Sequence, residues 1–186
     1  MPTDTLAANK SKLFELLKTQ AFFREKIVLS SGKMSDYYFD ARRVTLSAAG
    51  AYLSAKIILE MIKNDRAEHI GGPTLGADPL VGALGVLSYQ MSQPLATFII
   101  RKSPKAHGIQ QQIEGPVLSP GARVILIDDV ATTGKALVES LEILKRLDIM
   151  PLKAVCLIDR QEGARDALAK FQCPLESIFT EQDFLK

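Results

Sequence analysis

Residues 124–135 are Val-Ile-Leu-Ile-Asp-Asp-Val-Ala-Thr-Thr-Gly-Lys, and this stretch decides the fold class. Its first four residues form an apolar run typical of a strand buried on both faces. Asp128 and Asp129 follow the run, then a small turn with hydroxyl and glycine residues. A helix is predicted over 134–147, where leucines recur at helical spacing. A buried strand that leads directly into a helix is the building unit of parallel sheets.

On both sides of this stretch, short apolar runs alternate with segments of helical period. Such alternation predicts an α/β fold: an open, mainly parallel twisted sheet with helices on both faces. Residues 1–45 fit the alternation less well, and we expect them to form a small hood over the site within a single domain of residues 1–186. Ser47 is a plausible N-cap. The predicted helices cover residues 6–19, 47–64, 77–89, 134–147 and 161–171, and the predicted strands cover 27–29, 37–39, 69–72, 95–100, 123–127 and 152–158.

Composition narrows the class of protein. The chain has 186 residues and a net charge of +2, without a basic tail or an acidic run, so we expect no nucleic-acid or membrane binding. The N-terminus lacks the apolar stretch of a signal peptide, and the longest apolar run is too short to span a bilayer, which predicts a soluble, cytoplasmic protein. The two cysteines, Cys156 and Cys173, are expected to be structural thiols.

The turn after the two carboxylates has the composition of an anion site. Backbone N–H groups at a helix N-terminus attract phosphate, Thr132 and Thr133 add hydroxyl donors, and Gly134 permits close approach. Asp128 and Asp129 can accept hydrogen bonds from a sugar diol or organise hydrated Mg²⁺. An ordinary capped crossover helix is the alternative. A nucleoside-triphosphatase is disfavoured, because no Gly-x-x-x-x-Gly-Lys-Ser/Thr sequence exists in the chain.

Four apolar residues, two acids, an apolar pair and Thr-Thr-Gly resemble the phosphoribosyl pyrophosphate (PRPP) signature of type I phosphoribosyltransferases. The resemblance implies that family's fold. It also implies that Asp128 and Asp129 bind the ribose hydroxyls and that the turn holds the 5-phosphate. The PRPP-binding residues implied by the family are Arg101, Lys102, Lys105, His107, Asp128, Asp129, Val130, Ala131, Thr132, Thr133, Gly134, Lys135, Ala136, Thr74 and Leu75.

A second motif is the basic segment 101–108, Arg-Lys-Ser-Pro-Lys-Ala-His-Gly, inside a stretch (102–120) without clean periodicity. A stretch of that length is typical of a functional lid or a linker. No acidic residue lies between Asp78 and Glu114, so its cations are expected to be free of local neutralisation, although a solvated surface loop is the alternative. The segment resembles the Arg-Lys-x-x-Lys-x-His-Gly loop of orotate phosphoribosyltransferases.

That resemblance implies four catalytic residues: Lys105, Arg101, His107 and Asp129. In the family this loop reaches into the partner's site, which implies a homodimer with shared active sites and Lys102 acting within its own subunit. Cations and Mg²⁺ would meet the negative charge that grows on departing pyrophosphate. Mg²⁺ is implied as the cofactor. It would be carried by PRPP and would contact Asp128 and Asp129 at most through water.

The base-binding residues implied by the resemblance are Thr132, Arg160, Tyr38, Phe39 and Lys33. A guanidinium at the end of the next strand can grip a carboxylate bidentately. An arginine paired with Glu162, and an aromatic strand buried in the core, are the alternatives. The chain departs from some family members at Met34 and Leu75, where those members have lysine.

The expected activity is transfer of 5-phosphoribosyl from PRPP to orotate, giving orotidine 5′-monophosphate and pyrophosphate in de novo pyrimidine (UMP) biosynthesis. A phosphoribosyltransferase for another base, and a non-catalytic PRPP-binding regulator, are the alternatives. The near-neutral charge and short chain weigh against the regulator.

Overall fold

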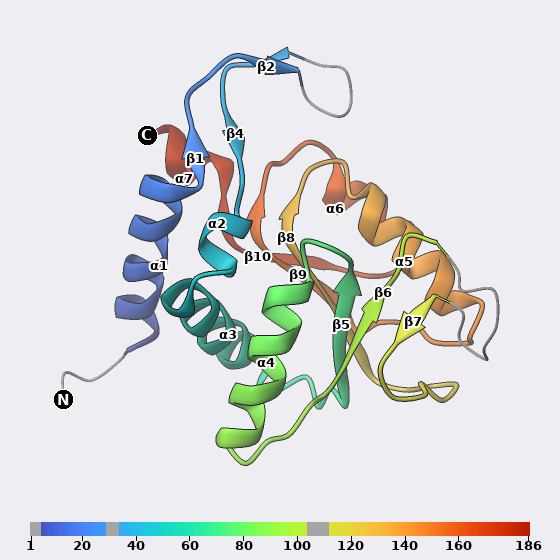
Figure 1. The fold of residues 1–186 in the computed structure, drawn as a ribbon. Coiled ribbons are helices and arrows are strands. Elements are labelled where there is room, and N and C mark those ends of the chain that lie inside the picture. The colour runs from blue at the N-terminus through green and yellow to red at the C-terminus, as the bar shows by residue number, and fades with distance from the viewer. Residues whose placement is uncertain (1–4, 29–33, 104–111) are drawn as a thin grey trace.

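The central feature of the computed structural model, which describes residues 5–28, 34–103 and 112–186, is one six-stranded sheet (Figure 1). Its strand order is β10-β9-β8-β5-β6-β7. All neighbours are parallel except β6 and β7, which are antiparallel. The strands are β5 (His69–Pro73), β6 (Ala96–Ile100), β7 (Ile113–Glu114), β8 (Val124–Ala131), β9 (Lys153–Asp159) and β10 (Leu175–Thr180).

Helices cover both faces of this sheet, as the sequence predicted. Alternate side chains of β8 point to opposite faces: Ile125 and Ile127 join one core cluster, and Val124 and Leu126 join the other. The first cluster includes side chains of α1 (Leu6–Gln20), α3 (Ala48–Ile62) and α4 (Asp78–Gln90). The second includes side chains of α5 (Lys135–Lys145) and α6 (Ala164–Ala169). Every residue of β9 is buried, and residues 154–158 between its charged ends, Lys153 and Asp159, are continuously apolar.

Local signals explain where the helices begin. Ser47 caps α3 as predicted, because its Oγ accepts a hydrogen bond from the Gly50 N–H at 3.1 Å. Helix α6 is shorter than the predicted 161–171 segment. Gln161 and Gly163 have φ angles of 55° and 106°, which no right-handed helix tolerates, so the helix starts only at Ala164.

The N-terminal region forms two small antiparallel pairs. Strand β1 (Phe22–Phe23) pairs with β4 (Tyr38–Phe39), and β2 (Ile27–Val28) pairs with β3 (Met34–Ser35); a short helix, α2 (Arg42–Thr45), follows. In Figure 1 these strands lie on the side of the molecule toward which β5 points. The sequence predicted strands at 27–29 and 37–39, but β1 and β3 were not predicted.

The C-terminal elements were also not predicted. Strand β10 extends the sheet beside β9, and α7 (Glu181–Leu185) follows it directly. Phe184 of α7 is 1% exposed and packs on Phe14 of α1, with ring centroids 4.8 Å apart, and on Phe39 of β4 at 5.0 Å. The last helix therefore joins the N-terminal region to the body of the protein.

The structure also bears on the predictions about membrane spans, cysteines and the 102–120 stretch. Within the described ranges, no helix combines the length and the apolar character needed to cross a bilayer. Cys156 and Cys173 are free and buried, as expected of structural thiols. The 102–120 stretch, predicted to lack regular structure, contains the short strand β7.

Candidate active site

Asp128 and Asp129 lie inside strand β8 rather than after it. The sequence predicted that the strand would end at Ile127, but its pairing with β9 continues to Ala131, opposite Asp159. The strand is longer than predicted because its backbone N–H and C=O groups continue to find hydrogen-bond partners in β9 as far as Ala131. The two acids therefore sit on a rigid element.

Both carboxylates are close to the backbone of their own strand. The Asp129 N–H donates to Asp128 Oδ1 at 2.9 Å, and the Val130 N–H donates to Asp129 Oδ1 at 2.8 Å. Burial, and next the charge of Asp129, raise the pKa of Asp128 well above its usual value. Burial also raises the pKa of Asp129, against hydrogen bonds and the charge of Arg42, which lower it. A cation or a diol bound here would favour the ionised pair.

The turn after β8 encloses a cavity of about 650 Å³, here called the turn cavity. Gly134 has a φ of 78° and starts α5; a Cβ on it would lie 3.0 Å from Ala164 Cα, so only glycine fits without displacing α6. The described residues lining the turn cavity are Lys102, Asp128, Val130, Ala131, Thr132, Thr133, Gly134, Lys135, Ala136, Glu139 and Glu162. The structure thus brings most of the predicted PRPP residues to one place.

A second cavity, of about 320 Å³, adjoins the loop after β5 and is called the β5 cavity. It shares Lys102, Asp128, Val130 and Ala136 with the turn cavity, so the two form one crevice. Its other described lining residues are Phe39, Asp40, Ala41, Arg42, Pro73, Thr74, Leu75, Gly76 and Asp129. The predicted residues Thr74 and Leu75, joined by a cis peptide bond, lie here.

Thr74 has a second role in this loop. Its hydroxyl donates to Asp78 Oδ2 at 2.8 Å, while the other oxygen of Asp78, Oδ1, is buried without a hydrogen-bond partner. Leu75, at the position where some family members have lysine, is 57% exposed. The loop therefore adds backbone groups, but no cation, to the crevice.

The basic segment is only partly described. Lys102 is exposed and lines both cavities. The expectation that Arg101 is free of local neutralisation is wrong: its Nη1 lies 3.2 Å from Glu114 Oε1. Glu114 reaches Arg101 because β7 folds back antiparallel to β6. Lys105, His107 and the predicted base-binding Lys33 lie outside the described residues.

Arg160 lies at the same end of the sheet, and its N–H donates to the Ala131 carbonyl at 2.8 Å. Its side chain, however, is only 6% exposed and is paired with Glu162, Nη2 to Oε1 at 2.9 Å. Of the described residues, Glu162 lines the turn cavity and Arg160 does not. The predicted pairing with Glu162 is present, but it is buried rather than on the surface.

The two predicted aromatic base-binding residues, Tyr38 and Phe39, lie in different surroundings. Phe39 lines the β5 cavity and also packs on Phe22, with ring centroids 5.0 Å apart. Tyr38 stacks on Phe23 at 4.8 Å and is not among the described residues lining either cavity. The alternative of a packing role therefore fits Tyr38 better than Phe39.

Sequence reasoning missed three residues near the crevice. Arg42 lines the β5 cavity, and its charge lowers the pKa of Asp129. Tyr37 and Glu181 surround Arg160. The adjacent arginines after the aromatic strand were a signal for Arg42, whereas Glu181 is 21 residues beyond Arg160 and carried no local signal.

A family profile described as the phosphoribosyl transferase domain matches residues 46–182, which include the sheet, the two acids of β8 and the glycine turn before α5. The fold and the site therefore belong to the class of phosphoribosyl transferases. An orotate phosphoribosyltransferase of Bradyrhizobium diazoefficiens is 35% identical over 183 residues, covering 97% of this chain and 98% of its own. One from Aquifex aeolicus is 36% identical, covering 97% and 100%.

Solved structures agree with these sequence matches. The orotate phosphoribosyltransferase of Mycobacterium tuberculosis H37Rv in complex with Fe(III) dicitrate has a TM-score of 0.83 at 30% identity, covering 95% of this chain and 98% of that one. In complex with PRPP, the same enzyme gives a TM-score of 0.79 at 26% identity, covering 96% and 99%. The chain belongs to the orotate phosphoribosyltransferase family.

Proposed function

We propose that this protein transfers the 5-phosphoribosyl group of PRPP to orotate, giving orotidine 5′-monophosphate and pyrophosphate in pyrimidine biosynthesis. One observation carries the proposal: Asp128, the turn 132–136 and Lys102 line a single cavity at the carboxyl end of the sheet. Ligands of open parallel sheets bind at such strand ends.

Different parts of the crevice suit the 5-phosphate, the ribose hydroxyls and the pyrophosphate of PRPP. The N–H groups of residues 131–136, at the N-terminus of α5, would hold the 5-phosphate. Asp128 and Asp129 would accept hydrogen bonds from the two ribose hydroxyls. The pyrophosphate would then lie in the β5 cavity, where the backbone of Thr74 and Leu75 and the charges of Lys102 and Arg42 face it.

Mg²⁺ fits the oxygen ligands of this crevice. It keeps several waters and is usually bound by one or two carboxylates together with substrate phosphates, and Asp128 and Asp129 offer two. In this proposal PRPP carries the metal into the crevice, and the two carboxylates contact it at most through water. When bound, Mg²⁺ would supply positive charge to the departing pyrophosphate.

No residue has to act as a nucleophile in this mechanism. The base would attack the anomeric carbon as pyrophosphate leaves, and the protein's contribution would be orientation and charge stabilisation. Arg101, Lys105 and His107 would stabilise the leaving group, with Lys105 as the main electrostatic catalyst. Arg101 would first have to leave Glu114, which pairs with it here.

The homodimer belongs to the same proposal, as do the hood role of residues 1–45 and a cytoplasmic location. The three loop cations would act in the partner's site, whereas Lys102 lines the cavities of its own chain. An apolar groove of about 530 Å³ between α3 and α4 gives a surface for a second copy. Exposed side chains there include Leu46, Tyr52 and Val86.

Thr132, Arg160, Tyr38, Phe39 and Lys33 are proposed to recognise orotate. Thr132 and Phe39 support this because each lines part of the crevice. For Arg160 to bind orotate, its ion pair with Glu162 would have to open, because Glu162 lines the turn cavity and Arg160 does not.

A spectrophotometric assay of orotate loss with PRPP, with and without Mg²⁺, tests the proposal. We expect turnover that requires Mg²⁺, and no turnover of hypoxanthine or uracil; the opposite substrate preference would refute it. Lys105→Ala should lower kcat by orders of magnitude with the fold intact. Arg160→Ala should mainly raise the KM for orotate.

A further inference from the structure

Three segments of the chain converge on the buried side chain of Arg160. They are the loop after β9, which carries Arg160 and Glu162, the start of α7 at Glu181, and the turn before β4 at Tyr37. Each of the three partners contacts a different part of the guanidinium. A buried cation held from several sides has lost most of its freedom to reorient.

The contacts differ in kind. Arg160 Nη2 lies 2.9 Å from Glu162 Oε1, and Nε lies 3.9 Å from Glu181 Oε2. Nε is buried and has no hydrogen-bond acceptor. The guanidinium carbon lies 5.1 Å from the centroid of the Tyr37 ring, and the Tyr37 hydroxyl donates to the same Glu181 oxygen. Tyr37 and Glu181 therefore act as one unit against Arg160.

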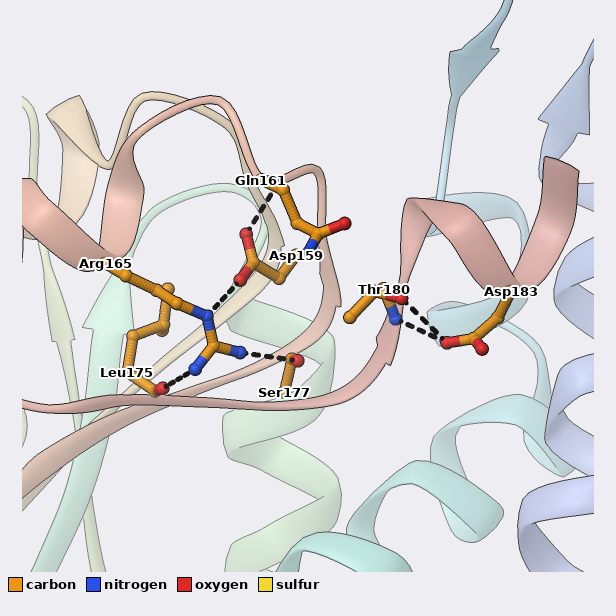
Figure 2. Close-up of polar contacts among 7 residues, drawn as sticks. All are labelled: Asp159, Gln161, Arg165, Leu175, Ser177, Thr180 and Asp183. Atoms are coloured by element: carbon orange, nitrogen blue, oxygen red, sulfur yellow. Dashed lines mark hydrogen bonds and ion pairs between the residues drawn. The ribbon is translucent and has the colours of Figure 1, made fainter.

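Hydrogen bonds of neighbouring residues hold the two segments that carry Glu162 and Glu181 (Figure 2). Asp159, which is 0% exposed, accepts hydrogen bonds from the Gln161 N–H at 2.8 Å and from Arg165 Nε at 2.7 Å. Beside α7, Asp183 Oδ2 accepts from the N–H and the hydroxyl of Thr180, at 2.8 and 3.0 Å. This capping arrangement sets the position of Glu181 at the first residue of the helix.

The two acids next to Arg160 have different access to the crevice. Glu162 lines the turn cavity, where a ligand would meet it. Glu181 is not among the described lining residues and is tied to Tyr37. Burial, and next the hydrogen bond to Glu181, raise the pKa of Tyr37, so its hydroxyl stays a proton donor at neutral pH. Of these two acids, Glu162 is therefore the one that an anionic ligand in the turn cavity would meet.

We propose that Glu181 and Tyr37 are positioning residues that hold the Arg160 guanidinium for the substrate base, while Glu162 occupies the place that the base's carboxylate takes. This rests on the proposed function. On binding, the anionic base displaces Glu162 from Nη2, and Glu181 keeps Nε in place. The two acids, both neighbours of one arginine, therefore have opposite effects on binding.

The test compares matched substitutions. Glu181→Gln and Tyr37→Phe should each raise the KM for orotate about tenfold, because each weakens the support that holds the guanidinium in place, without changing the KM for PRPP. Their effects should not add, because both remove the same support. Glu162→Gln should lower the KM for orotate about threefold, because a competing anion is removed. Asp166→Asn, the same charge change on an exposed residue of α6, should change neither constant.

A second readout does not depend on turnover. The Nε–H nitrogen-15 NMR signal of Arg160, assigned by its loss in Arg160→Lys, should shift and exchange faster with water in Glu181→Gln and Tyr37→Phe, and stay unchanged in Asp166→Asn. An unchanged signal in Glu181→Gln overturns the inference whatever the substrate is. So does a rise in the KM for orotate that is equal in Glu162→Gln and Glu181→Gln. Failure of the wild-type protein to consume orotate refutes the proposed function instead, and the NMR result still decides whether Glu181 holds Arg160.

Discussion

Gly76 passes so close to Asp129 that a Cβ placed on it would lie 2.5 Å from the Asp129 Oδ1 atom. The same Cβ would lie 2.8 Å from Asp128 Oδ1. The loop after β5 therefore rests directly on the two carboxylates of β8. This contact links the proposed pyrophosphate side of the crevice to the proposed ribose side.

Gly76→Ala should disable PRPP binding rather than folding. The added methyl group has to push the loop away from Asp128 and Asp129, which misplaces groups on both sides of the crevice. We expect kcat/KM for PRPP to fall about 100-fold, with a thermal midpoint within a few degrees of the wild-type value. Steady-state kinetics and calorimetry check this, and normal kinetics would show that the loop yields easily.

Asp128→Asn should stabilise the protein and abolish most of its activity. The ionised Asp128 is disfavoured by burial and by Asp129, and an amide keeps the acceptor for the Asp129 N–H. Thermal unfolding at neutral pH should show a free energy of unfolding roughly 1 kcal/mol higher than that of the wild type. Because the folded-state pKa is raised, the gain should be near zero below the usual carboxyl pKa, grow as the pH rises, and level off above the folded-state value. A gain that grew toward low pH would contradict this assignment.

Gly134→Ala should cost more stability than Gly121→Ala, which is its matched control. Both glycines have left-handed φ angles, 78° and 75°, but a Cβ on Gly121 meets no atom within 4 Å, whereas one on Gly134 meets Ala164 Cα at 3.0 Å. The control should lose about 1 kcal/mol from backbone strain. Gly134→Ala should lose about 2–3 kcal/mol, since crowding against α6 is added. Urea unfolding measures both, and equal losses would exclude a packing role for Gly134.

Arg165→Leu should destabilise the protein because it leaves Asp159 fully buried without its cation. The guanidinium is itself 53% exposed, so a loss of about 2 kcal/mol is expected, less than for a fully buried pair. Adding Asp159→Asn should recover part of the loss, since an amide oxygen can still accept from the Gln161 N–H. Denaturant unfolding of the single and double variants checks this, and strictly additive losses would argue against the pair.

Local sequence predicted much of the sheet and the crevice. The apolar run before Asp128 and the glycine after Thr133 define a strand and a turn by their own chemistry, and the structure places both at one cavity. The predicted end of β8 was wrong, because the strand is extended by its pairing with β9. Asp128 pairs with Cys156, 28 residues further along the chain, and such a partner is not visible in a local pattern.

The acidic partners of Arg101 and Arg160 were harder to predict than the helices and strands. Glu114 reaches Arg101 only because a two-residue strand, too short for a periodic signal, turns back on β6. Glu181 meets Arg160 because β10 joins the sheet next to β9 and delivers α7 to the same end. Both contacts arise from tertiary structure, and neither residue stands out in sequence.

The buried cysteines have a practical consequence. Burial, and next the charges of Asp159 and Asp128, raise the pKa of Cys156, and burial raises the pKa of Cys173 to about 11. Alkylating dyes react with thiolates at accessible sulfur, and the chain's only two cysteines offer neither property. A cysteine introduced at a solvent-facing site such as Tyr89, which is 77% exposed, would therefore take a fluorophore alone, without prior removal of native thiols.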